Sequence, residues 1–137
     1  MYRLAYVSTA HENITSIDLQ DILEAAIRNN SEQDVTGTLL FNGANFLQIL
    51  EGPEEKVEQT YERICSDNRH RHVVTIYREG GTRRSFSESP MSLNTVKSKI
   101  GALPDGVALS SDLDLFLPAG LPPYLRTILT SFNTMQA

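Results

Sequence analysis

One pair of predicted strands constrains the fold of this chain more than any other feature of its sequence. Residues 35–41 and 46–50 are two mostly apolar runs, and only Asn-Gly-Ala-Asn at 42–45 separates them. Because Asn and Gly both tolerate positive φ, Asn-Gly between apolar runs predicts an antiparallel hairpin. The elements on either side of this hairpin then decide which sheet it joins.

Both sides of the hairpin carry a helical pattern. Before it, Thr15 and Asp18 form a capping-box pair, and apolar residues follow at helical spacing as far as Asn30. After it, Gly52-Pro53 and two glutamates open a second helix, because proline suits the first turn and acids complement the helix dipole. Each strand of the hairpin is therefore joined to a helix.

Three further strand-like runs complete a sheet. Residues 2–8 and 73–77 are short and mostly apolar, and a turn is expected at 79–82. Residues 84–93 predict a fifth strand, in which Pro90 must sit at an edge, an end or a break. The order βαββαββ predicts an α/β (α+β) fold with a ferredoxin-like sheet and two helices on one face.

The C-terminal part of the chain has a different amino-acid composition. After Lys97 it is rich in Gly, Pro and Ser, until Pro122-Pro123 opens a helix with apolar residues at positions i, i+3, i+4 and i+7. A sheet with two apolar faces cannot leave one of them in water. We therefore expect this last helix to cap the second face of the sheet.

The composition suits one globular domain. The chain has 137 residues, of which 40% are hydrophobic, and its formal net charge of −5 argues against nucleic acid as the main partner. No stretch approaches ~18 consecutive apolar residues, and the N-terminus lacks a signal-peptide core. The single cysteine, Cys65, cannot form an internal disulfide and is expected to be a core thiol in a reducing compartment. We expect a cytoplasmic protein without a membrane or nucleic-acid partner.

Several polar side chains are expected among apolar neighbours, namely Tyr6, Asn30 and Gln48. An unpaired buried amide costs roughly 1–3 kcal/mol, so each amide must find partners. Two interpretations stay open: these side chains bond within the protein, or they face a planar ligand whose edge alternates carbonyl and N–H groups. Arg63 and Asp67, four residues apart, are likewise either an exposed ion pair or part of a polar rim around such a ligand.

Familiar catalytic signatures are missing from the sequence. It has no GxGxxG, P-loop or CxxC pattern, and His70 and His72 have no third metal ligand near them, so no metal site is expected. A small ferredoxin-like hydrolase remains an alternative, since the chain is long enough for an anion-binding loop near an arginine and an asparagine. That alternative leaves Gln48, which stands between two pairs of apolar residues, unexplained.

Five short segments share their order and spacing with a known family. They are LAYVS at 4–8, RNN at 28–30, VTGTLL at 35–40, FLQILEG at 46–52 and DNRH at 67–70. Together they resemble BLUF domains, the blue-light sensors using FAD, and FLQILEG is the most specific of them. The resemblance implies a flavin-binding domain at 1–93, followed by a C-terminal loop and helical cap at 94–137.

The resemblance also implies a cofactor and a mechanism. FAD, with FMN or riboflavin as alternatives, would lie between the two helices above the sheet. Tyr6 would give an electron and a proton to the excited flavin, and Gln48 would rearrange its hydrogen bonds between Tyr6 and the flavin N5/O4 edge. The cofactor-binding residues implied in this way are Asn29, Asn30, Gln48, Arg63, Asp67, Arg69 and His70.

One departure from the family concerns the fifth strand. Where the family commonly has Trp-x-Met, this chain has Ser89-Pro90-Met91, and it contains no tryptophan. Met91 is retained as a photoactive residue, and we expect the output to pass through Met91 and the backbone of this strand. Without a neighbouring indole, the photochemistry is expected to run mainly through Tyr6.

The implied function is that of a non-catalytic photoreceptor of the short, stand-alone type. A change at Gln48 would be signalled to an unidentified partner protein through the fifth strand and the helical cap. The apolar face of the cap offers a surface for homo-oligomers. The remaining alternative is a flavin-free interaction module, which Ser89 permits and the retention of Tyr6, Asn30 and Gln48 opposes.

Overall fold

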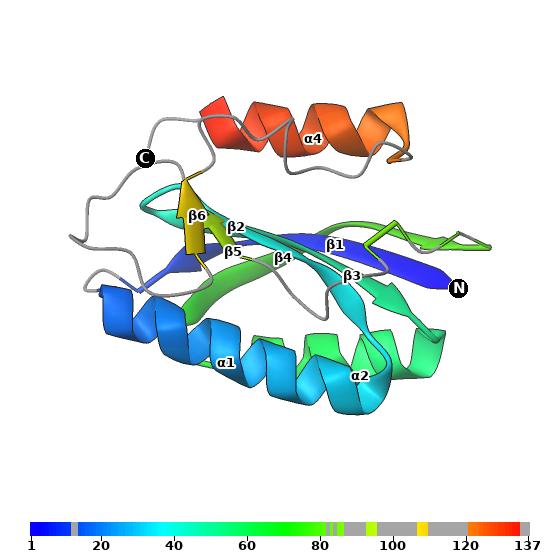
Figure 1. Ribbon diagram of the computed structural model, residues 1–137, viewed down its shortest axis with the longest axis horizontal. Coiled ribbons are helices and arrows are strands. Elements are labelled where there is room, and N and C mark those ends of the chain that lie inside the picture. Colours follow the sequence, from blue (N-terminus) through cyan, green and yellow to red (C-terminus); the bar gives the residue numbers. More distant parts are fainter. Residues whose placement is uncertain are drawn as a thin grey trace.

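Within the described residues, six strands form one sheet, and helices cover both of its faces (Figure 1). The computed structural model describes residues 1–11, 14–81, 83, 85–86, 93–95, 107–109 and 121–134. Within this part of the chain the elements are β1 (Tyr2–Ala10), α1 (Ser16–Gln33), β2 (Thr36–Phe41), β3 (Asn45–Gly52), α2 (Glu54–Cys65), β4 (His70–Gly80), β5 (Leu93–Thr95), β6 (Val107–Leu109) and α4 (Pro123–Thr134). The strand order in the sheet is β4-β1-β3-β2-β5-β6.

The four longer strands confirm the ferredoxin-like prediction. β1 lies between β3 and β4, β3 pairs with β2, and all three pairings are antiparallel. β2 and β3 are the predicted hairpin. Its turn is closed by the Asn42 side chain, which accepts the N–H groups of Ala44 and Asn45 at 3.1 and 2.8 Å. Gly43 adopts a φ of 100° there, the conformation for which Asn-Gly turns select glycine.

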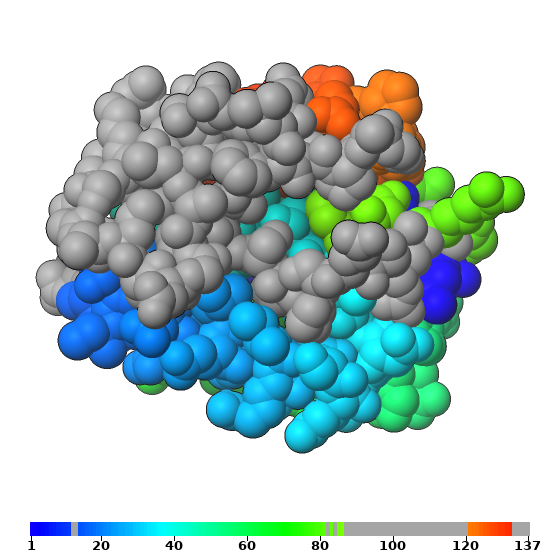
Figure 2. Space-filling model, viewed as in Figure 1, coloured from blue at the N-terminus to red at the C-terminus, as the bar shows by residue number. Residues whose placement is uncertain are grey.

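Helices α1 and α2 begin where the sequence predicts. The Thr15 hydroxyl accepts the Asp18 N–H at 3.1 Å, and the Asp18 carboxylate accepts the Thr15 N–H at 2.9 Å, which closes the capping box. α2 follows Pro53 directly and has two acids in its first turn. Both helices lie on one face of the sheet (Figure 1), and α1 forms an outer surface of the molecule there (Figure 2). None of the described helices is long and apolar enough to cross a membrane.

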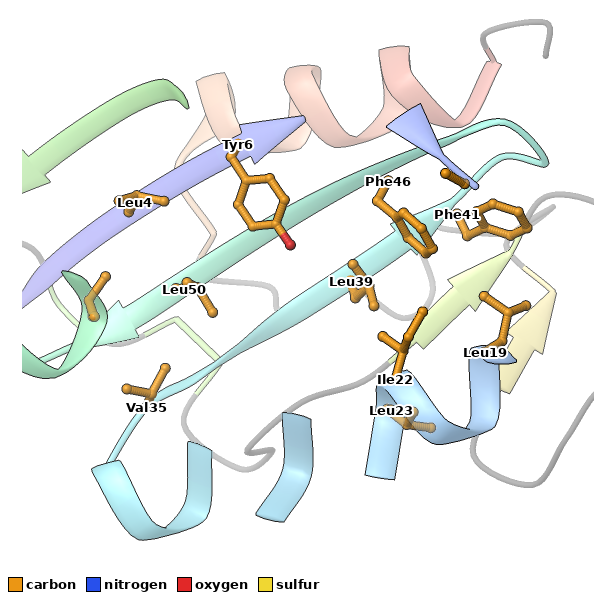
Figure 3. Packing of buried hydrophobic residues seen from close by; sticks show 12 residues of the cluster. Leu4, Tyr6, Leu19, Ile22, Leu23, Val35, Leu39, Phe41, Phe46 and Leu50 are labelled. Atoms are coloured by element: carbon orange, nitrogen blue, oxygen red, sulfur yellow. The ribbon is translucent and has the colours of Figure 1, made fainter. Parts of the chain in front are cut away.

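The sheet separates two hydrophobic cores, because successive residues of a strand point to opposite faces. Tyr6 lies in the core under α1 and α2, whereas Ala5, its neighbour on β1, packs in the core under α4. Figure 3 shows the first core, in which Leu39 of the sheet faces Ile22 of α1. The second core confirms the predicted cap, to which α4 contributes Leu125, Leu129 and Phe132.

One edge strand is longer than predicted. β4 runs from His70 to Gly80, whereas the apolar run at 73–77 covers only its middle. Tyr2 pairs with Gly80, so the strand continues into the predicted turn at 79–82. The ends of β4 are polar and are held by backbone pairing with β1. They therefore lack the alternation of apolar and polar residues from which a strand is predicted.

The other edge of the sheet consists of two three-residue strands. β5 pairs in parallel with β2, with Leu93 opposite Leu39, and β6 pairs in parallel with β5. The predicted fifth strand at 84–93 shares only Leu93 with β5, and its residues Ser89 and Met91 lie outside the described part of the chain. Strands of this length carry no periodicity, which is why β6 was not predicted.

The prediction that Cys65 is a core thiol is wrong, because its side chain is exposed. Cys65 is the last residue of α2, and the preceding Ile64 is the residue that packs against the core. Neighbouring residues of a helix point about a quarter turn apart, so Cys65 turns outward at the end of α2.

Candidate functional site

Tyr6 and Gln48 form the centre of the site. They are direct partners in the pairing of β1 with β3, and both side chains lie on the face that α1 and α2 cover. Tyr6 is fully buried and Gln48 is only 3% exposed. The Tyr6 hydroxyl donates a hydrogen bond to Gln48 Oε1. The register of the two strands therefore creates this contact.

A cleft opens in front of Gln48, between α1 and α2. Its empty space, counted together with the open solvent at its mouth, is about 470 Å³. Tyr6 lies behind Gln48 rather than on the wall of the cleft. All of the predicted cofactor-binding residues line the cleft: Asn29, Asn30, Gln48, Arg63, Asp67, Arg69 and His70.

Helix α1 presents two adjacent amides to the cleft, of which Asn29 is half-buried and Asn30 is buried. The Asn30 carbonyl oxygen accepts the N–H of Val35 at 2.9 Å and the N–H of Asp34, whose φ of 57° ends the helix. α1 thus ends one turn after it has carried Asn30 into the cleft. This position explains why the apolar stripe of the helix ends in an amide.

Asp67 and Arg69, which follow α2, form the polar end of the cleft. The Arg69 guanidinium donates to both Asp67 oxygens, with a shortest distance of 2.7 Å, and the Arg69 backbone N–H adds a bond at 3.0 Å. Burial favours the neutral acid, but these hydrogen bonds and the guanidinium charge outweigh it and lower the pKa of Asp67. The ion pair of Asp67 is therefore with Arg69, while Arg63 lines the cleft from the last turn of α2.

His70 supplies a polar wall without charge. Its ring centroid lies 4.7 Å from that of Phe46, and its Nδ1 lies 2.9 Å from the Ser8 hydroxyl oxygen. Burial is the main cause that lowers the pKa of His70 from 6.5 to about 4; Arg69 adds to the shift and Asp67 opposes it. The imidazole is therefore neutral at neutral pH.

The Tyr6 phenol is held in its protonated form. Burial raises the pKa of Tyr6 well above its ordinary value, and Cys65, Tyr61 and Asp67 add to the shift. A protonated phenol is a hydrogen-bond donor, which agrees with its bond to the amide oxygen of Gln48. Tyr6 therefore does not ionise by itself at neutral pH.

Six residues of the cleft wall were not predicted: Ile22, Ala25, Ala26, Leu39, Thr60 and Ile64. A signal was present for two of them, because Ala25 and Ala26 stand one helical turn before the two asparagines and so share their side of α1. The buried Thr60 gave no comparable signal, since its hydroxyl donates to the backbone of its own helix at 2.9 Å.

The side chains around the cleft fit the edge of a flavin ring. Asn30 and Gln48 each offer a donor and an acceptor, which a heterocyclic edge with alternating carbonyl and N–H groups requires. Apolar side chains of α1, β2 and α2 provide walls for a planar ring, and Asp67 with Arg69 provides a polar end. Within the described residues, no group of three or more His, Cys, Asp or Glu side chains is placed to hold a metal ion.

A comparison with protein families identifies the class of this protein. The model of the BLUF family, described as sensors of blue light using FAD, matches residues 1–92. The chain therefore belongs to this family of blue-light sensors, as the segments at 4–8 and 46–52 predicted. FAD is the cofactor of the family, which confirms the predicted flavin.

Curated relatives match more than half of the chain and are much longer. The blue light- and temperature-regulated antirepressor BluF of Escherichia coli (strain K12) is 39% identical over 90 residues, which are 66% of this chain and 22% of that protein. The photoactivated adenylate cyclase subunit beta of Euglena gracilis is 42% identical over 74 residues, which are 54% of this chain and 9% of that protein. The chain thus spans less than a quarter of either relative.

Solved structures match nearly the whole chain. Klebsiella pneumoniae BlrP1, determined with FMN and cyclic diGMP, has a TM-score of 0.78 and 30% identity, and the match covers 96% of this chain and 34% of that one. BlsA in its ground state has a TM-score of 0.70 and 26% identity, and the match covers 98% of this chain and 89% of that one. The sheet and its helices therefore have the arrangement of known BLUF proteins.

Proposed function

We propose that this chain holds FAD in the cleft between α1 and α2 and reports blue light without catalysing a reaction. The observation that carries the proposal is the buried hydrogen bond from Tyr6 to Gln48 at the wall of the cleft. The residues that would hold the cofactor are Asn29, Asn30, Gln48, Arg63, Asp67, Arg69 and His70.

Tyr6 is the proposed donor. Bound flavin supplies the absorption of blue light and an electron acceptor in the excited state. Because burial raises the pKa of Tyr6, the hydroxyl proton leaves only together with an electron from the ring. The hydrogen bond to Gln48 gives that proton a path toward the cleft. Met91, which lies outside the described residues, completes the proposed photoactive set.

Gln48 is the proposed switch. An amide presents an acceptor at one end and a donor at the other, so rotation or tautomerisation reverses what it offers to the cleft. Gln48 is nearly inaccessible to water, which raises the cost of any arrangement that leaves its polar atoms without partners. The rearranged amide therefore persists after the electron has returned to Tyr6.

The output is proposed to be a contact with another protein in the cytoplasm. Support comes from the relatives, because both are similar to this chain while one is named as an antirepressor and another as an adenylate cyclase subunit. A domain that occurs in proteins with such different names supplies the light sensing that they have in common. The output then comes from another domain or from a partner protein. In this chain the output would pass through the predicted fifth strand at 84–93 and through α4.

Reconstitution with FAD, FMN and riboflavin in separate samples tests the cofactor. The protein should become yellow with FAD, and blue light should shift the flavin absorption band reversibly to the red. A protein that stays colourless with all three flavins contradicts the proposal.

The substitution Gln48→Leu tests the switch, because it removes the amide and keeps a side chain of similar size. We expect the variant to bind flavin and to lose the red shift. Gln59→Leu is the matched control, since Gln59 is exposed on α2 and its amide donates to Glu55, one turn earlier. A full red shift in Gln48→Leu would leave the cofactor in place and overturn the switch.

A further inference from the structure

Glu51, in the FLQILEG segment, is a buried acid outside the cleft. It lies three residues after Gln48 on β3, so the two side chains point to opposite faces of the sheet, and it is 0% exposed. Its carboxylate accepts the Thr36 hydroxyl at 3.1 Å and the backbone N–H groups of Ser85, at 2.9 Å, and of Phe86. Glu51 thus binds the segment that follows β4 to the middle of the sheet.

Arg3 is the buried cation that matches Glu51. It is directly opposite Glu51 in the pairing of β1 with β3, and its guanidinium lies 3.5 Å from the carboxylate. The same guanidinium donates to the Arg83 carbonyl and to the Ser85 hydroxyl, both at 2.9 Å. A buried ion pair is stable only when further hydrogen bonds satisfy both charges. Here Arg83, Ser85 and Phe86 supply such hydrogen bonds to the two partners, while Arg3 Nε has no partner within the described residues.

Phe86 extends this arrangement to the helical cap. Its side chain is buried in the core under α4, which also contains Leu125 and Leu129. The carboxylate that holds the Phe86 N–H therefore also fixes where the Phe86 ring enters that core. One strand, β3, carries Gln48 toward the cleft and Glu51 toward the cap.

We propose that Arg3 and Glu51 form a clamp that couples the switch at Gln48 to Ser85, Phe86 and α4. The inference rests on the proposed function, and Glu51 acts as a positioning residue. Tyr6 and Gln48 join the same two strands as Arg3 and Glu51, about 10 Å away along the strands. A rearrangement of Gln48 shifts β3 against β1, changes the geometry of the clamp and loosens its hold on Ser85 and Phe86.

Amide hydrogen exchange, resolved by NMR on the full chain loaded with FAD, tests the clamp in darkness and under continuous blue light. The Ser85 and Phe86 amides should exchange at least about tenfold faster in light, because a hydrogen bond to a charged acceptor has been weakened. Equal exchange in both conditions, together with a normal red shift, makes the clamp a static brace and overturns the inference alone. A missing red shift overturns the proposed function, and the inference with it.

Glu51→Gln separates the clamp from the photochemistry. The substitution keeps the size of the side chain and removes its charge, so Ser85 and Phe86 should exchange rapidly in darkness and should lose their response to light, while the red shift is retained. Glu58→Gln is the matched control, because Glu58 binds Arg78 on the other side of the sheet and should keep the wild-type exchange. A wild-type light response of these amides in Glu51→Gln contradicts the clamp.

A milder variant serves if Glu51→Gln does not fold. Ser85→Ala removes only the hydroxyl that Arg3 holds and keeps the amide bound by Glu51. A difference between the dark and light exchange of Phe86 that is smaller than in the wild type supports the clamp, and an unchanged difference opposes it.

Discussion

Tyr6 and Gln48 meet because β1 and β3 carry them on the same face at the same register position. A shift of one residue in either strand would turn one of the two side chains toward the core under α4. Their contact therefore depends on strand register more than on side-chain flexibility. Removing a single hydroxyl at this position is a sharp test of its role.

Tyr6→Phe removes the hydroxyl that donates to Gln48. We expect flavin binding to be kept, the light-induced red shift to be lost and the free energy of unfolding to fall by about 1–3 kcal/mol, because a buried acceptor loses its donor. Tyr61→Phe is the matched control: its ring lies 5.7 Å from that of Tyr6, but its hydroxyl binds Thr75. Time-resolved absorption that shows undiminished flavin reduction in Tyr6→Phe would identify another donor.

His70 makes stability depend on pH. Its pKa is lowered from 6.5 to about 4 in the folded chain, so between these values the unfolded chain binds a proton that the folded chain does not. The stability is therefore complete above the unfolded pKa and falls as the pH is lowered through this window, by on the order of 3 kcal/mol in total. The carboxyl of Asp67, whose pKa is lowered from 3.8, titrates below the window.

Urea unfolding at both ends of this window measures the effect. His70→Gln should remove most of the slope, because no buried imidazole then resists protonation. His11→Gln, the same substitution at a histidine with a half-buried side chain, should keep the slope. Equal stability of the wild-type chain at both ends contradicts the prediction.

At the scale of elements, local signals could be predicted from the sequence and distant pairings could not. The capping box at Thr15 and the Asn-Gly turn at 42–45 act within a few residues, and both were found in place. The ends of β4 and the strands β5 and β6 depend on partners far along the chain, which propensity does not encode. The spacing of the sequence did not decide whether Asn30 bonds to the protein backbone or to a ligand. That choice depends on the distance between α1 and α2, which the pattern of neither helix contains.

Gly37 tests the hairpin as an element. A Cβ added at this position of β2 would collide with the carbonyl oxygen of Ile49 on β3, where the backbones approach closely. We expect Gly37→Ala to lower the free energy of unfolding by at least about 3 kcal/mol, because backbone must move. It should also weaken the red shift, since β3 carries Gln48. Gly80→Ala is the matched control, because a Cβ there meets no atom within 4 Å; equal losses in urea unfolding would contradict this account.

At the scale of the whole molecule, the sheet separates the proposed flavin cleft from the core under α4. The cleft lies between the sheet and the helices α1 and α2, whereas Ser85, Phe86 and α4 lie against the opposite face. The two faces share β1 and β3, which carry the Tyr6–Gln48 contact and the Arg3–Glu51 ion pair. A signal can cross the sheet through these two strands even though each face has its own hydrophobic core.

Because the sheet separates the two cores, a cavity made in one core should affect flavin affinity differently from a similar cavity made in the other. Leu129→Ala in the core under α4 and Leu19→Ala in the core under α1 each truncate a fully buried side chain, so each should cost about 2–5 kcal/mol in urea unfolding. Flavin affinity should change by no more than about twofold in Leu129→Ala, because the cavity lies across the sheet from the cleft. It should fall further in Leu19→Ala, one turn from Ile22 in the cleft wall. Equal losses of affinity would show that the two cores act as one.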